Sequence, residues 1–454
     1  MKRIANSRRE EKVKTQTAKP GSASRAAGML TLACFLVAFS TSAAISNTNW
    51  IGINPGGANG LVKAVAADAS DNVFIGGVFT VVNGMTVNWI ARWNGSVWSS
   101  VGSGMNNSVH ALAVSGNDLY AGGAFTTAGG NMAHRIARWN GSSWSPLGAG
   151  MNGSVYALAI SGGDLYVGGQ LTTGDPGKGV ARWNGIGWSP VGTGITNADV
   201  RAVAVSGANV YAGGIFTTAG GTVGNYIAKY DGSVWSPMGS GMNNSVYALA
   251  VLGGELYAGG WFTTAGGNPA SHIAKWNGSS WSQVGSGING NVFSLAVSGS
   301  DLYAGGEFTM AGGNPANRIA KWDGNTWSPL GSGIEGFGPE ADALAVSATS
   351  LYAGGIFTKA GGKPTVNVAR AVFIAPSLPL LLSSPALAGG AFTAWFTNTP
   401  GATFGGLGAT GLSQSLNTWL PAGSVTEVTP GLFQFTDPQA GNSGQRYYRI
   451  QWPE

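Results

Sequence analysis

Cysteine is almost absent from this sequence: Cys34 is the single one among 454 residues. The rest of the chain therefore has neither disulfides nor thiolate metal sites. Histidine is also scarce, and the three present, His110, His134 and His272, share no spacing that suits a metal ion. A phosphate-binding turn and a serine-nucleophile elbow are missing as well. The sequence thus predicts no cofactor, no metal site and no catalytic constellation.

Charge is sparse and unevenly placed. Lysine and arginine total 24 and aspartate and glutamate 19, but the first 44 residues hold 8 of the basic and 2 of the acidic side chains. The remainder keeps 16 basic and 17 acidic residues, a net charge near −1. No basic stripe with interleaved aromatic residues remains, so we expect no nucleic-acid partner.

Long hydrophobic runs are lacking too. The apolar stretch from Met29 to Phe39 has the length of a signal peptide and is shorter than the roughly 20 residues that cross a bilayer. It follows a basic segment and precedes small residues, so residues 1–44 are predicted to be a cleaved signal peptide. The pair Arg8-Arg9 and Cys34 leave a twin-arginine signal and a lipoprotein anchor as alternatives. We expect a secreted or cell-surface protein with no transmembrane segment in the mature chain.

Glycine, in contrast, is abundant and periodic. A double glycine recurs at intervals of 46, 46, 45, 46, 46 and 49 residues. The pairs are Gly76-Gly77, Gly122-Gly123, Gly168-Gly169, Gly213-Gly214, Gly259-Gly260, Gly305-Gly306 and Gly354-Gly355. A fixed period of this size indicates a repeat architecture, in which each unit buries its faces against its neighbours.

One repeat, residues 246–289, shows what each unit builds. Short apolar runs lie at 246–251, 256–262, 272–276 and 281–284, separated by segments rich in Gly, Asn and Ser. Runs of this length between turn residues are typical of strands, and nothing in the repeat reaches helical length. Four antiparallel strands form one blade of a β-propeller.

A hairpin motif supports the pairing of the last two strands. Trp276 and Trp281 flank a four-residue loop that begins Asn277-Gly278, so the two indoles are predicted to face each other. The pair recurs as Trp93/Trp98, Trp139/Trp144, Trp183/Trp188, Tyr230/Trp235 and Trp322/Trp327. We interpret these aromatics as core between blades, with a row of sugar-stacking platforms as the alternative.

The order of these motifs resembles the Kelch repeat: a double glycine ends a strand, an aromatic residue and a turn follow, and a Trp comes five residues later. The likeness covers about residues 47–374. The repeat here is shorter, has Trp in place of the usual Tyr, and carries a fixed Phe-Thr-Thr-Ala-Gly-Gly segment. A WD40 repeat fits less well because no Gly-His…Trp-Asp pattern is present. Some Kelch propellers are copper oxidases with a Cys-linked Tyr, which a chain without mature cysteine cannot form.

The repeats predict an all-β fold: a seven-bladed propeller at residues 45–374 with four-stranded blades. Six units carry the complete aromatic hairpin, and the seventh lacks a fourth strand. Residues 49–54 look like the missing strand, so we expect the N-terminal strand to pair with the last unit and close the ring. Residues 375–454 break the repeat and contain several short strand-like runs, which predict a small C-terminal β-sandwich.

One position varies widely within a recurring run whose consensus is Val-x-Ala-Leu-Ala-Val. The resemblance to Kelch blades implies that this first strand is innermost, so x is expected near one mouth of the central channel. A position that packing does not constrain can vary to suit a ligand. Neutral variation at the rim of the channel would give the same pattern and is the alternative. The candidate ligand-binding residues are Lys63, His110, Tyr156, Arg201, Tyr247, Phe293 and Asp342.

Two other recurring positions have structural explanations. A basic residue on the third strand, such as Arg138 or Lys275, is interpreted as a stem packed along the blade, with an anion-binding ring as the alternative. Asp118, Asp164 and Asp301 lie in the first hairpin turn, where a turn role is favoured over calcium binding.

The functional hypothesis is a secreted, non-catalytic binding, adhesion or scaffold protein whose ligand lies at the channel mouth. The expected partner is a glycan or protein at the cell surface, and a monomer is expected. Two alternatives remain: a structural protein of the cell envelope, and a carbohydrate-active hydrolase or lyase that uses carboxylates such as Glu340 and Asp342.

Overall fold

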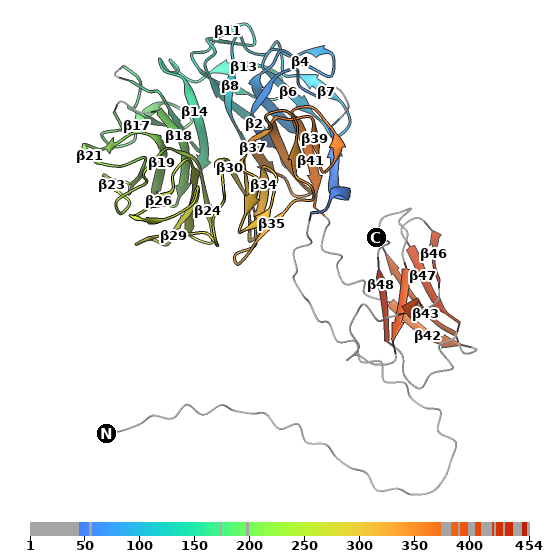
Figure 1. The fold of residues 1–454 in the computed structure, drawn as a ribbon. Coiled ribbons are helices and arrows are strands. Elements are labelled where there is room, and N and C mark those ends of the chain that lie inside the picture. The colour runs from blue at the N-terminus through green and yellow to red at the C-terminus, as the bar shows by residue number, and fades with distance from the viewer. Residues whose placement is uncertain are drawn as a thin grey trace, which may run out of the picture. The chain divides into compact units, whose positions relative to one another are not determined.

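The computed structural model describes residues 45–53, 57–172, 174–196, 199–373, 383–388, 391–397, 405–409, 420–421, 424–429, 432–438 and 447–451. The predicted signal peptide and the linker after residue 373 lie outside these ranges. Throughout the described ranges the secondary structure is β, apart from one short 3-10 turn, η1 (Asn47–Asn49). The fold is propeller-like, with repeated antiparallel sheets of four strands (Figure 1).

In every propeller sheet but the last, the four strands follow the chain from the inner to the outer strand. The first strands are β2 (Leu61–Ala67), β8 (Val109–Ser115), β14 (Val155–Ser161), β18 (Asp199–Ser206), β24 (Val246–Leu252), β30 (Asn291–Ser298) and β37 (Glu340–Val346). The second strands are β3 (Val73–Val78), β9 (Asp118–Gly123), β15 (Asp164–Gly169), β19 (Asn209–Ile215), β25 (Glu255–Gly260), β31 (Asp301–Glu307) and β38 (Ser350–Ile356).

The outer strands are shorter. The third strands are β6 (Ile90–Trp93), β12 (Ile136–Trp139), β16 (Val180–Trp183), β22 (Ile227–Tyr230), β28 (Ile273–Trp276), β34 (Ile319–Trp322) and β41 (Val368–Val372). The fourth strands are β7 (Trp98–Ser100), β13 (Trp144–Pro146), β17 (Trp188–Pro190), β23 (Trp235–Pro237), β29 (Trp281–Gln283), β35 (Trp327–Pro329) and, from the start of the chain, β1 (Trp50–Gly52).

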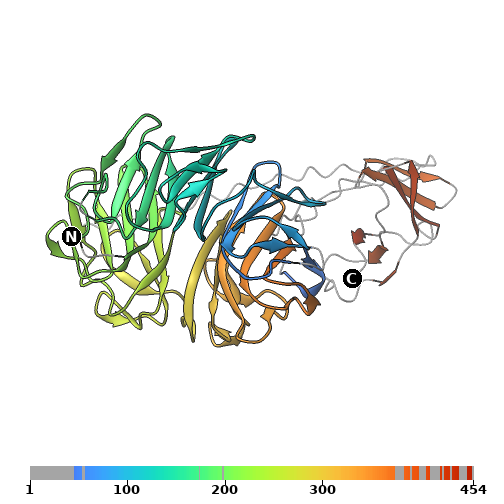
Figure 2. The same cartoon turned by 90° about the horizontal axis from the view of Figure 1, so that it is seen from above.

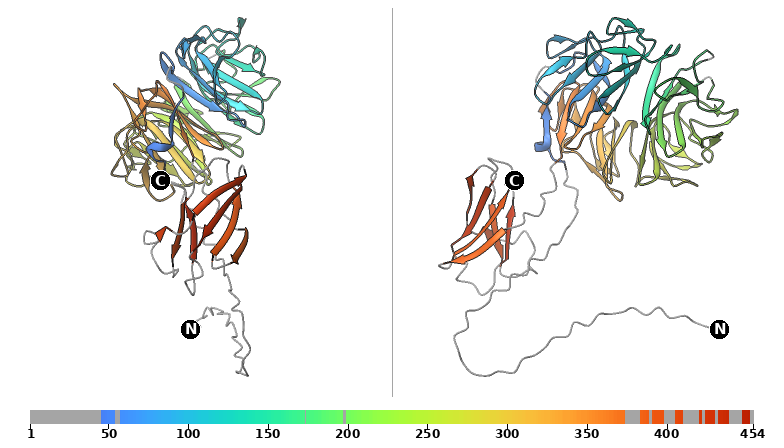
Figure 3. Two further views of the ribbon diagram at one scale, coloured as in Figure 1. Left: turned by 90° about the vertical axis from the view of Figure 1, so that its right-hand side faces the viewer. Right: turned by 180° about the vertical axis from the view of Figure 1, so that it is seen from behind.

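The N-terminal strand completes the last sheet, as expected from the sequence. β1 pairs antiparallel with β41, with Trp50 opposite Ala371 and Gly52 opposite Ala369. The first strands touch one another in chain order from β2 to β37, and β37 in turn contacts β2. Figures 1, 2 and 3 show the first sheet (blue) beside the last (orange). The first and last strands of the repeat region are therefore in contact: β1 pairs with β41, and β2 lies against β37.

The double glycine explains how neighbouring sheets approach each other. A Cβ atom added to Gly259 would lie 2.5 Å from Cγ1 of Val292, the fully buried valine of the next first strand. Gly354 in the last sheet meets Cγ1 of Val62 in the first sheet in the same way, at 2.4 Å. Only glycine leaves room for this close contact, so the motif is a packing device.

The outer hairpins form as the sequence predicts. Trp276 lies directly opposite Trp281, with ring centroids 5.3 Å apart. In the loop between them, the Asn277 side chain accepts hydrogen bonds from the backbone N–H groups of Ser279 and Ser280, and Gly278 has φ +101°. Asn-Gly is needed here because the amide closes the turn and glycine adopts the left-handed backbone.

The Gly-rich segment after each double glycine is more ordered than a plain loop. It forms a small arm of two paired two-residue strands in most units: β4–β5 (Val81–Val82, Met85–Thr86), β10–β11 (Thr127–Ala128, Asn131–Met132), β20–β21 (Thr218–Ala219, Thr222–Val223), β26–β27 (Thr264–Ala265, Asn268–Pro269), β32–β33 (Met310–Ala311, Asn314–Pro315) and β39–β40 (Lys359–Ala360, Lys363–Pro364), the last with β36 (Ile334–Glu335). The side chain of Asn243 holds one arm by accepting hydrogen bonds from the backbone of Thr263 and Thr264. From the sequence, residues 263–271 are expected only to form a polar, Gly-rich loop, so these short paired strands were not predicted.

The C-terminal residues form two separate sheets. The first contains β42 (Ser383–Ala388), β43 (Ala391–Thr397), β46 (Ser424–Thr429) and β47 (Leu432–Asp437). The second contains β44 (Gly405–Ala409), β45 (Leu420–Pro421) and β48 (Tyr447–Gln451). Phe433 and Phe435 are buried on β47. The strand-like runs expected from the sequence lie at 391–397, 402–407, 432–436 and 446–452; the first has the bounds of β43, the other three overlap β44, β47 and β48, and none corresponds to β42, β45 or β46.

Candidate functional site

The variable residue of each first strand lies at a β-bulge. In every sheet the pairing of the first and second strands shifts register between the residue before and the residue after this position. In the fifth sheet, for example, Val246 faces Gly260 and Ala248 faces Gly259, so Tyr247 has no partner across the ladder. Because a bulge adds an unpaired residue and redirects its side chain, the fold frees this position from the packing of the sheet.

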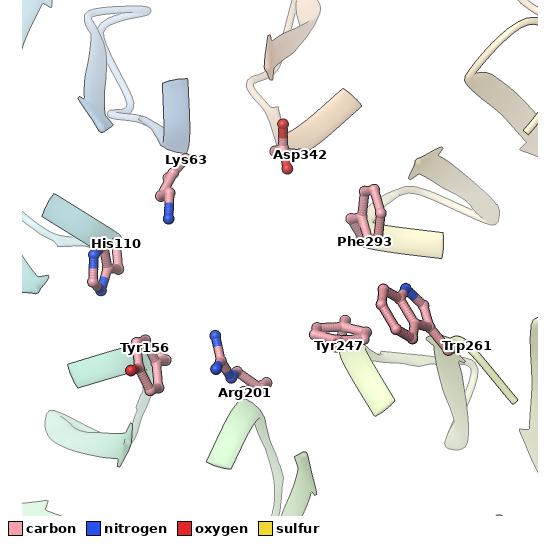
Figure 4. A pocket seen from close by; sticks show the side chains of 8 residues that line it. All are labelled: Lys63, His110, Tyr156, Arg201, Tyr247, Trp261, Phe293 and Asp342. Atoms are coloured by element: carbon pink, nitrogen blue, oxygen red, sulfur yellow. The ribbon is translucent and has the colours of Figure 1, made fainter. Parts of the chain in front are cut away.

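These bulges bring all of the sequence-predicted residues to one cavity of about 260 Å³. Figure 4 shows their side chains arranged around a central space, each from a different sheet. The lining consists of Lys63, His110, Tyr156, Arg201, Tyr247, Phe293 and Asp342, together with Trp261. None of the predicted residues lies elsewhere.

Trp261 is the lining residue that sequence reasoning missed. It directly follows the double glycine of its unit, and its side chain is 45% exposed. The same position holds Val78, Ala124, Gln170, Ile215, Glu307 and Ile356 in the other units. This second variable position was visible in the repeat, and comparing every column of the repeat would have found it.

One side of the cavity is an aromatic wall, defined here as Tyr247, Trp261 and Phe293. The rings of Tyr247 and Trp261 have centroids 5.6 Å apart, and Phe293 meets Tyr247 edge to face at 6.0 Å. Tyr247 contacts both of the other rings, so the three aromatic side chains give this side of the cavity an apolar surface.

The opposite side carries basic and aromatic groups. The Arg201 guanidinium lies over the Tyr156 ring, 4.0 Å from its centroid, and forms an ion pair of 2.6 Å with Asp199. His110 stacks on the same tyrosine at 5.3 Å. Burial, followed by the nearby charges of Lys63 and Arg201, lowers the pKa of His110 to about 4, so this imidazole is neutral at pH 7.

Asp342 stands between these two sides (Figure 4). Burial, together with the charges of Glu340 and Glu307 and against the opposing charge of Lys63, raises the pKa of its carboxyl to about 7. Burial, and then Glu307, also raises the pKa of Glu340. Asp342 is therefore close to half-protonated at neutral pH, and it can donate or accept a hydrogen bond.

Several polar atoms of the lining are buried without a partner. They are Nδ1 of His110, Nε of Arg201 and Oδ2 of Asp342. Lys63 adds an ammonium group that forms no hydrogen bond or ion pair with the part of the chain that the structure describes. Unsatisfied buried groups cost free energy, and a polar ligand would recover it where these side chains turn so that their buried atoms reach the cavity.

The other candidate positions have structural partners. Third-strand basic residues pair with the first hairpin turn, as in Arg138–Asp118 at 2.9 Å and Lys321–Asp301 at 3.3 Å. This pairing agrees with the packed-stem interpretation and leaves no ring of free cations there. Across the described ranges, no group of three or more His, Cys, Asp or Glu side chains is placed to hold a metal ion. No described helix has the length and apolar character to cross a membrane.

Comparisons with known proteins find structural similarity alone. No protein-family model matches the chain, and no curated protein does. Among solved structures, the chain is similar to one in the crystal structure of the mitotic checkpoint complex, with 15% identity, 74% of this chain and 98% of that chain covered, and a TM-score of 0.48. The WD40 β-propeller domain of Doa1 matches with 15% identity, 74% and 97% coverage and a TM-score of 0.47. BamB from Moraxella catarrhalis matches with 12% identity, 69% of this chain and 84% of that chain covered, and a TM-score of 0.37. The functional argument therefore rests on the cavity itself.

Proposed function

We propose that this chain is a secreted, non-catalytic binding protein, with its ligand at the channel mouth of a seven-bladed, Kelch-like propeller. The cyclic contacts of the first strands and the Gly-Gly and Trp-Asn-Gly-x-x-Trp motifs support this architecture. The proposed division is a signal peptide at residues 1–44, the propeller at 45–374 and a β-sandwich module at 375–454. The mature protein is a monomer, either secreted or at the cell surface.

The observation that carries the proposal is the convergence of the variable residues. The residues that flank the bulged position change little from unit to unit, the bulged position changes widely, and the bulged side chains meet around one cavity. A rigid scaffold that holds variable side chains in a concave site is typical of a binding surface. The cavity combines an aromatic wall with unpaired polar atoms, which suits a glycan or a protein side chain as partner.

A triple substitution tests this function. Arg201→Ala, Tyr247→Ala and Asp342→Ala together should abolish binding to the ligand that the mature protein selects from an array of glycans and cell-wall polymers. The three residues lie on different sheets and are partly exposed, so the fold should survive. Binding is measured by array fluorescence and the fold by thermal unfolding.

A matched variant changes the same residue types outside the cavity. Asp118→Ala, Tyr120→Ala and Arg138→Ala remove an aspartate, a tyrosine and an arginine that pair on the second and third strands of one sheet. This variant should bind as well as the parent. Full binding by the first variant, at unchanged stability, would mean that the ligand site lies elsewhere.

A second candidate function is glycoside hydrolysis or lyase chemistry, favoured by one observation. Asp342 and Glu340 are neighbouring carboxyl groups whose pKa values are both raised, and such groups serve as general acids. Turnover of a polysaccharide by the mature protein, lost in Asp342→Asn and in Glu340→Gln, would establish this function. Binding without turnover would favour the non-catalytic one.

A further inference from the structure

The chemistry of the cavity is divided between its two sides. Figure 4 shows the aromatic wall on one side and the side chains of Lys63, His110, Tyr156 and Arg201 on the other, with Lys63 and Arg201 directed toward the centre. A ligand that fills the space must therefore present an apolar face in one direction and polar or charged groups in the other.

The aromatic wall favours a flat, partly apolar ring. A pyranose exposes C–H groups on its faces and hydroxyl groups around its rim, so one face can pack on Tyr247 and Phe293 while the rim remains polar. A cation held in an aromatic cage needs open space between ring faces. Here the ring centroid of Tyr247 lies 5.6 Å from that of Trp261 and 6.0 Å from that of Phe293, so no space for a cation is left between these rings.

The unpaired atoms also favour a hydroxylated ligand. Nε of Arg201 donates, Oδ2 of Asp342 accepts while it is ionised, and Nδ1 of His110 does either according to its tautomer. A hydroxyl group both donates and accepts, so a polyol can satisfy donors and acceptors that line one small cavity. An apolar ligand of the same size would leave them buried and unpaired.

The charge of the ligand is set by the side chains that reach the centre. Lys63 has no partner in the described part of the chain, and the paired Arg201 keeps its Nε free. An ammonium group entering here would be repelled by both cations, whereas a carboxylate would form charge-assisted hydrogen bonds with them. Glu307 and Glu340 act in the opposite sense, but neither side chain lines the cavity.

We propose that the cavity binds a sugar unit that carries a carboxylate, with its ring face on the aromatic wall and the carboxylate between Lys63 and Arg201. This inference rests on the proposed binding function and adds the chemical class of the ligand to it. Because Asp342 lies between Lys63 and Phe293, its carboxyl group contacts a hydroxyl group on the rim of the sugar ring.

The same geometry makes binding depend on pH. Asp342 faces Lys63 on β2, Glu340 on its own strand and Glu307 on β31, and its pKa is raised to about 7. A protonated Asp342 donates to the ligand and adds no negative charge beside the carboxylate. The affinity for an acidic sugar should therefore fall several-fold between about pH 6 and about pH 8, while His110, with a pKa of about 4, stays neutral.

The test uses three probes that share the same pyranose ring and differ in charge. They are the anionic methyl β-D-glucuronide, the neutral methyl β-D-glucoside and the cationic methyl β-D-glucosaminide. Titration calorimetry or ligand-observed NMR with the mature protein at about pH 6 gives the three affinities. We expect the glucuronide to bind about tenfold more tightly than the glucoside, and the glucosaminide most weakly.

Two substitutions assign the contacts. Lys63→Met keeps an unbranched stem without the charge, and it should abolish the preference for the glucuronide, so that this probe binds no more tightly than the glucoside. Lys229→Met makes the same change on a third strand outside the cavity and should alter nothing. Tyr247→Leu should weaken all three probes by a similar factor, and Asp342→Asn should flatten the pH dependence. Thermal unfolding of each variant reports whether the fold is retained.

The remaining outcomes separate this inference from the binding function beneath it. Equal affinity for all three probes, or tightest binding of the glucosaminide, would overturn the acidic sugar and leave a sugar site in place. If no probe binds but the triple variant of Arg201, Tyr247 and Asp342 still loses another ligand, the sugar class is wrong and the mouth remains the site. If the triple variant loses nothing, both proposals fail.

Discussion

Two titratable side chains in the cavity have pKa values shifted in opposite directions by the same cause. Burial raises the pKa of Asp342 from 3.8 to about 7 and lowers that of His110 from 6.5 to about 4. Both shifts favour the uncharged form. At neutral pH the lining therefore keeps a neutral imidazole, a half-ionised carboxyl and the charges of Lys63 and Arg201. This arrangement concentrates cationic charge on one side of the cavity.

Asp342 should make the folded state less stable as the pH rises. Its carboxyl has a higher pKa in the folded than in the unfolded chain, so this contribution to stability is complete below about pH 4 and is lost as the pH rises through about 7. Asp342→Asn removes the dependence. Between about pH 5 and about pH 8, the variant should therefore gain on the order of 1–3 kcal/mol relative to the parent. Denaturant unfolding at several pH values measures this difference.

The comparison with the variant is essential because His110 contributes in the opposite sense. Its lowered pKa adds stability that is present above about pH 6.5 and lost as the pH falls toward 4. The slope of the parent alone therefore mixes both groups, whereas the difference between parent and variant isolates Asp342. Asp323→Asn serves as the control, because the lowered pKa of Asp323 leaves it ionised throughout this range. A pH-independent difference for Asp342→Asn would contradict the proposed burial of the charge.

At the scale of elements, the double glycine joins one sheet to the next. In six of the seven pairs the first glycine faces the buried valine of the following first strand, whereas Gly305 faces Ala341; the second glycine of each pair lies against the backbone of its own first strand. At Gly260, an added Cβ would approach the carbonyl oxygen of Ser245 to 2.1 Å. The pair therefore fixes both the neighbouring sheet and the strand that carries the bulge, so packing between sheets positions the cavity lining.

Gly259→Ala should destabilise the protein by about 1–3 kcal/mol, because the new methyl group would lie 2.5 Å from Cγ1 of Val292. Val292→Ala removes that methyl group, and the double variant should be more stable than the sum of the single effects predicts, by more than about 0.5 kcal/mol. Denaturant unfolding of the four proteins gives the coupling energy. Gly187→Ala is the control, since an added Cβ there meets nothing within 4 Å. Additive effects would mean that the two sites do not clash.

Much of the element order could be predicted from the sequence because it follows from local rules. Short apolar runs give strands, Asn277-Gly278 gives a tight turn, and the fixed spacing places Trp276 opposite Trp281. The arms could not be predicted in the same way. Their two-residue strands are held by contacts from far along the chain, such as the side chain of Asn243 to the backbone of Thr263, twenty residues away.

The candidate site was predictable as a set of positions but not as a geometry. Variation in one column of the repeat identified residues such as Tyr247, and the resemblance to Kelch blades implied that they lie near one mouth of the central channel. The β-bulge that turns Tyr247 inward is defined by the register of two paired strands, which the sequence of one strand does not reveal. Trp261 was missed because it lies in a second variable column, beside an invariant motif.

At the scale of the whole molecule, the last sheet joins the first segment of the chain through a tryptophan, Trp50, that takes the place of a fourth-strand tryptophan. In five sheets the indole N–H of the fourth strand donates to a carbonyl oxygen of the preceding unit, as Trp281 does to Met238 at 2.9 Å. Trp50, fully buried, makes the same bond to Leu330 at 2.9 Å, although it comes from the start of the chain. The indole N–H of Trp98 has no partner among the described residues. The N-terminal strand thus replaces the fourth strand that the last unit lacks.

Deleting residues 47–55 should therefore lower the stability of the whole ring and not only of its last sheet. The deletion removes the pairing of β1 with β41, the Trp50 indole and the bond that Lys363 donates to the Trp50 carbonyl oxygen, at 2.6 Å. Replacing a buried tryptophan by alanine alone costs about 3–5 kcal/mol, and the deletion should cost at least as much, because an open ring also exposes the edge of β41. Differential scanning calorimetry should show one transition at a lower temperature, since each unit of such a repeat depends on its neighbours.

Trp50→Phe keeps the strand and loses the hydrogen bond, so it should cost less, while deleting residues 447–454 in the C-terminal region should leave the main transition in place. A shortened protein that melts like the parent would show that the N-terminal strand does not close the ring.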